Sequence, residues 1–448
     1  VMVNAAMPEP RLPLPEVLRA HARNTPDKQA LIWYGRAITY RELDELSDRC
    51  AAVLSRLGVK EGEPVALFMQ NCPQYVIAHL GIQKLGAVVS PCSPLFKSVE
   101  LAYQLGDLGA RVIIAADNLH SVIESARGET ALEQVALIHY QDFLPEQPTY
   151  SVPEEIRYAR NIPSGTVDLL AAIRAESGQP PHRTLGLDQL ALLVYTSGTT
   201  GRPKGILRPL PENPPSEPIA LFHFLAKLWQ CEEGMRYLSP APLYHSAPLA
   251  NVSVALRHGG TVVIMEHFDP LQYLELVERH RITHTQLVPT MFSRMLKLPE
   301  ADRRRHDLSS LKIAIHAAAP CPAQVKEAMI DWWGPIIHEY YGATEGMGFS
   351  ACNTPEWLAH RGSVGKVLMG DIHILDDAMQ PVAKGQTGEI WFKTANPFEY
   401  YRDPERTAQT RSADGTMTTV GDMGYLDDVG FLYLTDRSTF MIISGGVN

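Results

Sequence analysis

Residues 195–205 have the composition of a segment that binds phosphate. They read Tyr-Thr-Ser-Gly-Thr-Thr-Gly-Arg-Pro-Lys-Gly. The glycines, the last of them Gly205, allow positive φ and a close approach of the backbone, the hydroxyls can donate to phosphate oxygens, and Arg202 and Lys204 bring positive charge. A Walker A loop is excluded, because Pro203 stands where its second glycine belongs. The segment predicts a polyphosphate site of another kind, with these candidate contacts: Thr196, Ser197, Gly198, Thr199, Thr200, Gly201 and Lys204.

Three further segments follow in order. Tyr341-Gly342-Ala343-Thr344-Glu345 comes after the apolar strand candidate 336–337, Gly421-Asp422 comes later, and Asp436-Arg437 is last. Together with residues 195–205, they resemble the signature motifs of the adenylate-forming superfamily, which includes acyl-CoA synthetases, aryl-CoA ligases, nonribosomal adenylation domains and luciferases. The resemblance extends from about residue 14 to residue 448 and is closest to the AMP-forming acyl-CoA synthetases.

The resemblance implies a two-step activation of a carboxylic acid. A carboxylate is inert because it is negatively charged and has no good leaving group. Its attack on the α-phosphate of ATP expels pyrophosphate, and the acyl-adenylate is then taken by the thiol of coenzyme A. Charge builds up on the phosphates, so catalysis rests on positioning and electrostatic stabilisation. The resemblance assigns Mg²⁺ to Glu345, which suits a hard cation, and implies these catalytic residues: Thr196, Lys204, His245, Thr344 and Glu345.

A nucleotide site is also implied by the resemblance. Asp422 would accept both ribose hydroxyls, Arg437 would add a contact, and Tyr341 would stack on adenine. Small residues after a strand would form the other side of the adenine slot, with Ala317 where the family usually has glycine. Val420 replaces the family's usual threonine or serine, so one minor contact is lost. The expected nucleotide contacts on this side are Ala317, Ala318, Ala319, Pro320, Tyr340, Tyr341, Gly342, Ala343, Thr344, Asp422 and Arg437.

The acyl pocket is expected near His245, which matches the family's gate beside the reacting carboxylate. His245 either orients the substrate or is a core histidine, and the sequence leaves both open. Amino-acid-activating relatives typically place an aspartate there, so an amino acid substrate is disfavoured. The surroundings are apolar and suit a hydrophobic fatty, aryl, terpenoid or steroid acid. The expected pocket residues are Tyr244, His245, Ala247, Leu249, Ala317, Gly346 and Gly348.

Other functions remain open from the sequence. The acyl group could pass to a carrier protein in place of coenzyme A, and a luciferase-like oxidation is a weaker alternative. Family members continue into a mobile lid domain of about a hundred residues, whereas this sequence ends at Asn448 with Thr439 at the usual hinge position. We therefore expect the large N-terminal domain without its lid, with impaired turnover. A non-catalytic nucleotide-binding or acyl-binding module is the alternative from another class.

The composition of the chain limits the kinds of partner and the cellular location that can be expected. The formal net charge of −10 and the pI of about 5.9 argue against nucleic-acid binding, which needs a basic face. Six scattered cysteines without metal-ligand spacing predict reduced thiols and a cytoplasmic location. No signal peptide and no apolar run long enough to span a bilayer are evident. A homodimer is compatible with the sequence.

Strand and helix patterns alternate, which predicts an α/β fold with largely parallel sheets followed by a β-rich subdomain. A capping box of Thr39 and Glu42 begins one helix, and Gly58 is placed to end it. The expected subdomains are 1–190, 191–335 with the phosphate loop, and 336–437, followed by a hinge at 438–448. Expected strands are 65–69, 112–116, 135–138, 190–194, 261–265, 285–288, 312–315, 372–375, 388–393 and 431–434.

Two basic features have weaker assignments. The run 303–305 is expected to be a solvated helix face, although it could attract the phosphates of coenzyme A. Arg208 follows the phosphate loop and either assists phosphate binding or keeps the proline-rich surface insert 209–218 soluble.

Overall fold

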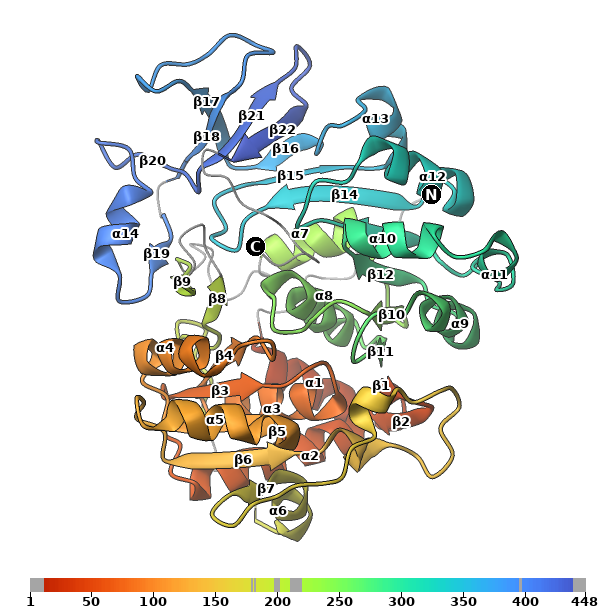
Figure 1. The fold of residues 1–448 in the computed structure, drawn as a ribbon, viewed down its shortest axis with the longest axis vertical. Coiled ribbons are helices and arrows are strands. Elements are labelled where there is room, and N and C mark those ends of the chain that lie inside the picture. Colours follow the sequence, from red (N-terminus) through yellow and green to blue (C-terminus); the bar gives the residue numbers. More distant parts are fainter. Residues whose placement is uncertain are drawn as a thin grey trace. The chain divides into compact units, whose positions relative to one another are not determined.

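The computed structural model describes residues 12–178, 180, 183–196, 202–209, 220–394 and 397–437, with the side chains of 220–223, 436 and 437 left out (Figure 1). The chain divides into two compact units. Unit 1 comprises residues 1–193, 210–237 and 242–266, and unit 2 comprises 194–209, 238–241 and 267–448. The subdomain boundaries expected from the sequence stay a prediction.

Unit 1 contains a five-stranded parallel sheet of order β4-β3-β5-β6-β7, whose colours run from red-orange at β3 to olive-yellow at β7 in Figure 1. All five residues of β5 are apolar and buried, as expected for a parallel strand covered on both faces. In the same unit β1 pairs in parallel with β11 and antiparallel with β2. The strands are β1 (Gln29–Trp33), β2 (Arg36–Thr39), β3 (Pro64–Phe68), β4 (Val88–Cys92), β5 (Val112–Ala116), β6 (Gln134–Ile138), β7 (Val167–Asp168) and β11 (Thr261–Ile264).

The helices of unit 1 include the one expected after Thr39. They are α1 (Leu14–Asn24), α2 (Tyr40–Arg56), α3 (Pro73–Lys84), α4 (Ser98–Leu108), α5 (His120–Arg127), α6 (Leu169–Ala175), α7 (Ala220–Leu228) and α8 (Ser246–Arg257), with the 3₁₀ turns η1 (Asp117–Leu119), η2 (Tyr140–Phe143) and η3 (Glu154–Ile156).

Helix α2 begins and ends as predicted, with one difference at its start. The Thr39 hydroxyl accepts a hydrogen bond from the backbone N–H of Glu42 at 3.2 Å. In a complete capping box the Glu42 carboxylate would accept a hydrogen bond from the backbone N–H of Thr39. Here that carboxylate pairs with Arg36 at 2.6 Å instead. At the other end Gly58 has a φ of 86°, the left-handed conformation that a glycine C-terminal stop requires.

Unit 2 holds three sheets. Strands β12, β13 and β14 are parallel to one another, and β15 and β16 continue that sheet antiparallel. A second, antiparallel sheet has the order β17-β18-β21-β22, with β20 paired to β18. These strands are β12 (His284–Leu287), β13 (Ile313–His316), β14 (Ile337–Gly342), β15 (Phe349–Cys352), β16 (Lys366–Met369), β17 (Asp371–Leu375), β18 (Gly388–Lys393), β20 (Met417–Thr418), β21 (Asp422–Leu426) and β22 (Leu432–Arg437).

The third sheet of unit 2 is small and has the order β19-β9-β8. Strand β10 (Arg236–Ser239) lies at the division between the two units. The remaining elements are β8 (Val194–Thr196), β9 (Lys204–Leu207), β19 (Glu399–Tyr400), α9 (Pro270–His280), α10 (Pro289–Leu296), α11 (Glu300–Arg303), α12 (Ala323–Trp333), α13 (Thr354–Ala359) and α14 (Pro404–Gln409).

The strand expected at 190–194 is wrong except at its end. Leu190 is 42% exposed, and β8 begins only at Val194. Between them the backbone makes a single parallel bridge, from Leu192 to Val89 of β4. An apolar run can pass beside a sheet edge without forming a strand, so the pattern alone misplaced the start. The other expected strands are present, with ends shifted by one to three residues in several cases.

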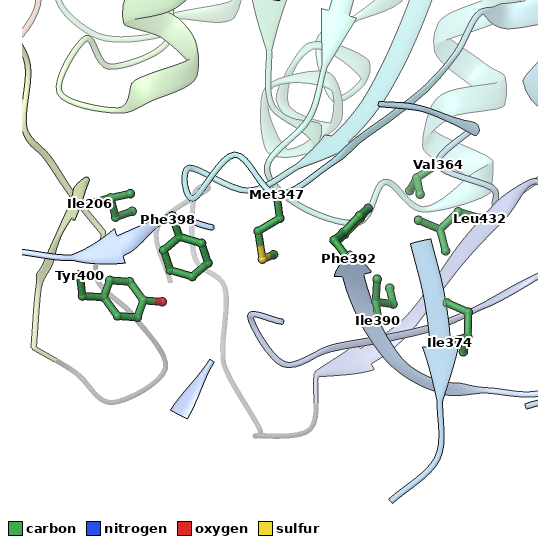
Figure 2. Close-up of a cluster of buried hydrophobic side chains, with 9 residues drawn as sticks. All are labelled: Ile206, Met347, Val364, Ile374, Ile390, Phe392, Phe398, Tyr400 and Leu432. Atoms are coloured by element: carbon green, nitrogen blue, oxygen red, sulfur yellow. The ribbon is translucent and has the colours of Figure 1, made fainter. Parts of the chain in front are cut away.

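A buried apolar cluster ties the sheets of unit 2 together (Figure 2). Ile206 and Tyr400 come from the paired strands β9 and β19, whereas Ile390 and Phe392 come from β18. Tyr341 and Ala343 pack against the cluster, so the segment leading to Glu345 is anchored by it. The full cluster is Ile206, Met347, Val364, Ile374, Ile390, Phe392, Phe398, Tyr400 and Leu432.

Two expectations about the whole chain can also be compared with the structure. All six cysteines are free, and four of them are buried. This agrees with the predicted reduced thiols. Among the helices that the structure describes, none is long and apolar enough to cross a bilayer.

We expect Gly348→Ala to destabilise the protein by about 1–3 kcal/mol through overpacking. A Cβ at this position would lie 2.0 Å from Cε1 of Phe392, which is buried in the cluster of Figure 2. Gly106→Ala in helix α4 is the control, because the nearest atom to its added Cβ is 3.9 Å away and alanine favours helix by about 0.5–1 kcal/mol. Denaturant unfolding measures both. Equal stability of Gly348→Ala and the wild type would contradict the packing argument.

Candidate functional site

The phosphate segment forms an antiparallel hairpin of β8 and β9 in unit 2. Thr196 lies opposite Lys204, and Tyr195 lies opposite Gly205. Gly205 corrects one expectation, because it lies in a strand without positive φ. A Cβ there would lie 3.0 Å from atoms of Tyr195 and Tyr401, so close packing explains the glycine. The candidate contacts Ser197, Gly198, Thr199, Thr200 and Gly201 lie outside the described residues.

Strand pairing brings Lys204 to a tyrosine that the sequence analysis did not identify. Tyr400 of β19 lies opposite Ile206 of β9, and side chains two residues apart on a strand share one face. Lys204 and Tyr400 therefore share a face, and the Lys204 Nζ lies 4.7 Å from the centroid of the Tyr400 ring. The Tyr400 hydroxyl donates a hydrogen bond to Oε1 of Glu345 at 3.1 Å. Lys204, Tyr400 and Glu345 thus form one cluster.

The Glu345 carboxyl is 9% exposed, and burial raises its pKa above the usual value. Its own backbone N–H, the Tyr400 hydroxyl, and the charges of Arg208 and Lys204 oppose this rise. Burial lowers the pKa of Lys204, and the positive charge of Arg406 lowers it further. The negative charges of Glu345 and Asp403 oppose this decrease. The site therefore gathers positive charge around one partly desolvated carboxylate.

Arg208 stabilises the turn that carries Glu345, an outcome that neither sequence assignment included. Its Nε donates to the carbonyl oxygen of Thr344 at 2.5 Å. Gly346 follows with a φ of 76°, and a Cβ on it would lie 3.2 Å from the same Nε. Gly346 and Gly348 therefore have conformational and packing explanations, and their predicted place in the acyl pocket stays a prediction.

As a ligand for Mg²⁺, Glu345 offers one carboxylate of the oxygen type that this ion prefers. In the part of the chain that the structure describes, no three His, Cys, Asp or Glu side chains gather as a metal site. The residues accordingly fit an ion that takes most of its ligands from water and nucleotide phosphates, as Mg²⁺ commonly does.

On the nucleotide side, β14 and β21 bring Tyr341 to Asp422. The Tyr341 hydroxyl donates to Oδ2 of Asp422 at 2.7 Å, and Asp422 is 7% exposed. Arg437 ends β22 in register with Asp422, and its side chain lies outside the described part. Tyr340 stacks on Phe349, with ring centroids 5.1 Å apart, and its hydroxyl accepts from Gln286 at 3.1 Å.

The small residues Ala317 to Pro320 form the connection from β13 to α12. Ala317 is buried, whereas Ala318 and Pro320 are exposed. Ala318 has a φ of 73°, a left-handed conformation that costs an L-residue about 1–2 kcal/mol. Such strain is concentrated at functional sites. The position whose backbone conformation favours glycine is therefore Ala318. It is not Ala317, which the sequence analysis matched to the family's usual glycine.

Four of the residues expected in the acyl pocket, Tyr244, His245, Ala247 and Leu249, belong to unit 1. His245 is the residue before α8, and its ring lies against Tyr244 with centroids 4.5 Å apart. Burial lowers the pKa of His245 to about 4, so its imidazole is neutral at pH 7. Leu243 is fixed by two groups of the α3 region, since its N–H donates to Asn71 and its carbonyl accepts from the Tyr75 hydroxyl. Leu249 is buried and Ala247 is partly buried.

In the basic run 303–305, Arg304 and Arg305 are exposed as expected, but the expected helix face is wrong for them, because α11 ends at Arg303. Arg304 pairs with Glu300 at 2.7 Å, and the Arg303 guanidinium lies 5.6 Å from the Trp332 ring centroid. Nearby, His306 contacts Glu278 at 2.7 Å. Glu300 thus compensates the charge of Arg304.

Comparison with known proteins identifies the class to which this fold belongs. Mixed α/β units with parallel sheets and separate antiparallel sheets are found in solved acyl-CoA ligases. The N-terminal domain of FACL13 from Mycobacterium tuberculosis matches with a TM-score of 0.74 and 26% identity over 95% of this chain and 99% of that chain. The anthranilate CoA ligase AuaEII shares the fold, with a TM-score of 0.78 and 24% identity over 100% of this chain and 82% of that chain.

The chain belongs to the family described as AMP-binding enzyme, whose model matches residues 18–402. It is 29% identical to a long-chain-fatty-acid–CoA ligase of Bacillus subtilis (strain 168), covering 99% of this chain and 80% of that protein. It is 31% identical to a feruloyl-CoA synthase of Amycolatopsis sp., covering 95% of this chain and 79% of that protein. Both relatives are CoA ligases, but they act on different acids.

These matches confirm the predicted fold class, the superfamily and the acid–CoA ligase class of enzyme. The chain corresponds to a large domain that covers the AMP-binding region. The use of ATP and coenzyme A agrees with this family, whereas Mg²⁺ and the roles of individual residues stay predictions.

Glu345→Gln should raise the melting temperature at pH 8. The pKa of Glu345 is higher in the folded protein than in the unfolded chain, so ionisation of Glu345 disfavours the folded state. The stabilisation of the fold by a protonated Glu345 is fully present below the unfolded pKa of about 4.3. It is lost as the pH rises through the folded-state pKa. The advantage of the variant should therefore shrink between pH 8 and pH 5. Thermal unfolding of wild type, Glu345→Gln and the exposed control Glu155→Gln measures this. A variant less stable than wild type at pH 8 would disprove it.

Ala318→Gly should leave stability unchanged or raise it by up to about 1 kcal/mol, since relief of the left-handed strain offsets the added backbone entropy of glycine. Ala319→Gly is the matched control and should lose about 0.5–1 kcal/mol, because Ala319 does not have a positive φ. Denaturant unfolding of the two variants gives the comparison. A larger loss in Ala318→Gly than in Ala319→Gly would reject the strain at this turn.

Proposed function

We propose that this protein activates a hydrophobic carboxylic acid with ATP and transfers the acyl group to coenzyme A. The observation that carries the proposal is the cluster of Lys204, Tyr400 and Glu345. Three separate segments place an ammonium 4.7 Å from the Tyr400 ring and a buried carboxylate 3.1 Å from its hydroxyl, at the end of a hairpin with phosphate-loop composition. Membership of the AMP-binding family supports the same reading.

In the first step, an oxygen of the substrate carboxylate forms a bond to the α-phosphorus of ATP, and the bond from that phosphorus to pyrophosphate breaks. Lys204 and the Thr196 hydroxyl would stabilise the negative charge that develops on the phosphates. Partial burial of Lys204 strengthens this interaction, because fewer water molecules screen the ammonium. Thr344, in the turn held by Arg208, would contribute a further phosphate contact.

Glu345 would hold Mg²⁺ together with the nucleotide phosphates. When bound, this ion would neutralise phosphate charge. The Tyr400 hydroxyl orients the Glu345 carboxylate, and the positive groups around it oppose the rise in its pKa that burial causes. Asp422 would accept the ribose hydroxyls, with Tyr341 already bonded to one of its oxygens.

In the second step, the sulfur of coenzyme A attacks the acyl carbon and the bond to AMP breaks. A hydrophobic acid is favoured by the apolar residues around His245 and by its neutral imidazole, which cannot pair with a charged group on the substrate. The relatives carry names as different as fatty-acid–CoA ligase and feruloyl-CoA synthase. We infer a hydrophobic acid without assigning its chain length or ring system.

The proposal is tested by acid-dependent release of pyrophosphate with ATP and Mg²⁺. The panel should include a long-chain fatty acid, a hydroxycinnamic acid, 2-succinylbenzoate and a polycyclic acid, with this chain and any longer form of the protein. Glu345→Ala should reduce release by about a hundredfold or more, as expected for loss of an electrostatic group. The surface control Glu155→Ala should retain the wild-type rate.

The outcomes separate the alternatives. Pyrophosphate release followed by CoA-dependent formation of AMP supports the ligase. If pyrophosphate is released but the acyl group is transferred only to a carrier protein, the acceptor is that carrier protein and not coenzyme A. ATP binding without pyrophosphate release from any acid, even in the longest form, would favour a non-catalytic binding module.

A further inference from the structure

Three buried ionisable side chains gather at the ends of the loop 317–322 in unit 2. Lys326 and His316 are fully buried, and Glu339 is 6% exposed. The Lys326 Nζ lies 2.5 Å from Oε2 of Glu339, and the His316 Nε2 lies 3.5 Å from the same oxygen. The Lys326 ammonium also lies 4.7 Å from the centroid of the Trp357 ring. The proposed reaction uses none of these groups directly.

The Glu339 carboxylate connects three segments. His316 ends β13 and lies opposite Glu339 of β14, and Lys326 lies in the first turn of α12. Because the loop 317–322 runs from β13 to α12, its end at α12 is fixed by the contact of Lys326 with this carboxylate, and its end at β13 is fixed by the pairing of β13 with β14. Glu339 also lies two residues before Tyr341 on the same strand. The carboxylate therefore connects the two sides of the proposed adenine slot.

Stability alone does not account for the ion pair. The free-energy cost of removing two charged groups from water offsets most of the attraction between them. An apolar pair of similar volume often stabilises a protein as well or better. Lys326 also lies in the first turn of α12, where the helix dipole disfavours a cation. Burial, with a contribution from Lys326, lowers the pKa of His316 far below its usual value, so the imidazole is neutral, and the short contact with Glu339 is made by Lys326. What an ion pair adds over apolar contact is a fixed direction and distance.

The loop between these fixed ends contains the strained residue Ala318, with a φ of 73°. A strained conformation persists only where the surrounding structure determines it. We propose that the Lys326–Glu339 ion pair is a positioning device, which holds the residues Ala317 to Pro320 and the Tyr341 ring at the separation that an adenine ring requires. This inference rests on the nucleotide site of the proposed function.

The test replaces both charges at once, with Lys326→Met and Glu339→Leu in one variant. Its melting temperature should equal or exceed that of the wild type. Calorimetric titration should show binding of AMP weakened about tenfold to a hundredfold, the usual effect of removing groups that orient direct contacts. Binding of inorganic tripolyphosphate should be unchanged, because it engages the phosphate segment and not the adenine slot. The ratio of the two affinities distinguishes positioning from general loosening.

The matched control is Glu327→Gln on the same helix. Glu327 pairs with Arg361 at 3.0 Å on the surface, so its loss should change neither affinity. If the double variant does not fold, the same two affinities of Lys326→Arg test the inference, because this substitution keeps the charge but changes the geometry of the pair. It should weaken AMP binding about threefold or more while leaving tripolyphosphate binding intact.

Wild-type AMP affinity in the folded double variant, or in Lys326→Arg if that variant decides, would overturn the inference. Equal weakening of AMP and tripolyphosphate would also overturn it, because the pair would then support the whole unit and not the slot. Failure of the wild type to bind AMP would refute the nucleotide site itself, and the inference would fall with the proposed function.

Discussion

The need to place a carboxylate out of water dominates the structure around the candidate site. Burial of Glu345 would be costly without partners. The fold supplies a hydroxyl from Tyr400 and positive charge from Lys204 and Arg208. Each partner depends on a different piece of architecture: the pairing of β9 with β19, the hairpin of β8 with β9, and the hydrogen bond from Arg208 to Thr344. The contacts that make the buried acid tolerable are also those that would attract a triphosphate.

This arrangement explains how an acidic protein can bind an anionic ligand. The formal net charge is −10, so the protein as a whole repels a nucleotide. Lys204, Arg208 and Arg406 act on a small region, and salt screens the more distant acids beyond about 10 Å. Local placement of cations therefore outweighs the overall charge. The net charge of the sequence argued against nucleic acid as a partner but could not locate this region.

Sequence reasoning reached the elements and residues that local pattern determines. The phosphate-binding character of the segment around Lys204, the parallel strands and helix α2 follow from composition and spacing within short windows, whereas Glu345 was assigned by the resemblance to the adenylate-forming superfamily. Tyr400 and the hydrogen bond of Arg208 were missed because they depend on contacts between distant segments; Arg208 and Thr344 are separated by 136 positions. The left-handed φ of Ala318 was not predicted, since φ depends on how the loop is held at both ends. The start of β8 was misplaced because apolarity does not report strand pairing.

The discontinuous course of unit 2 has a consequence for how this family can diversify. The β8–β9 hairpin is encoded before residue 210, whereas its partner strand β19 is encoded near residue 400. The stretch between them in the gene holds residues 210–237 and 242–266 of unit 1 and a larger part of unit 2. A crossover between two homologous genes in that stretch would join the lysine strand of one parent to the tyrosine strand of the other. Functional chimeras therefore require compatible residues at two remote places, and substitutions on β9 and β19 should covary among descendants.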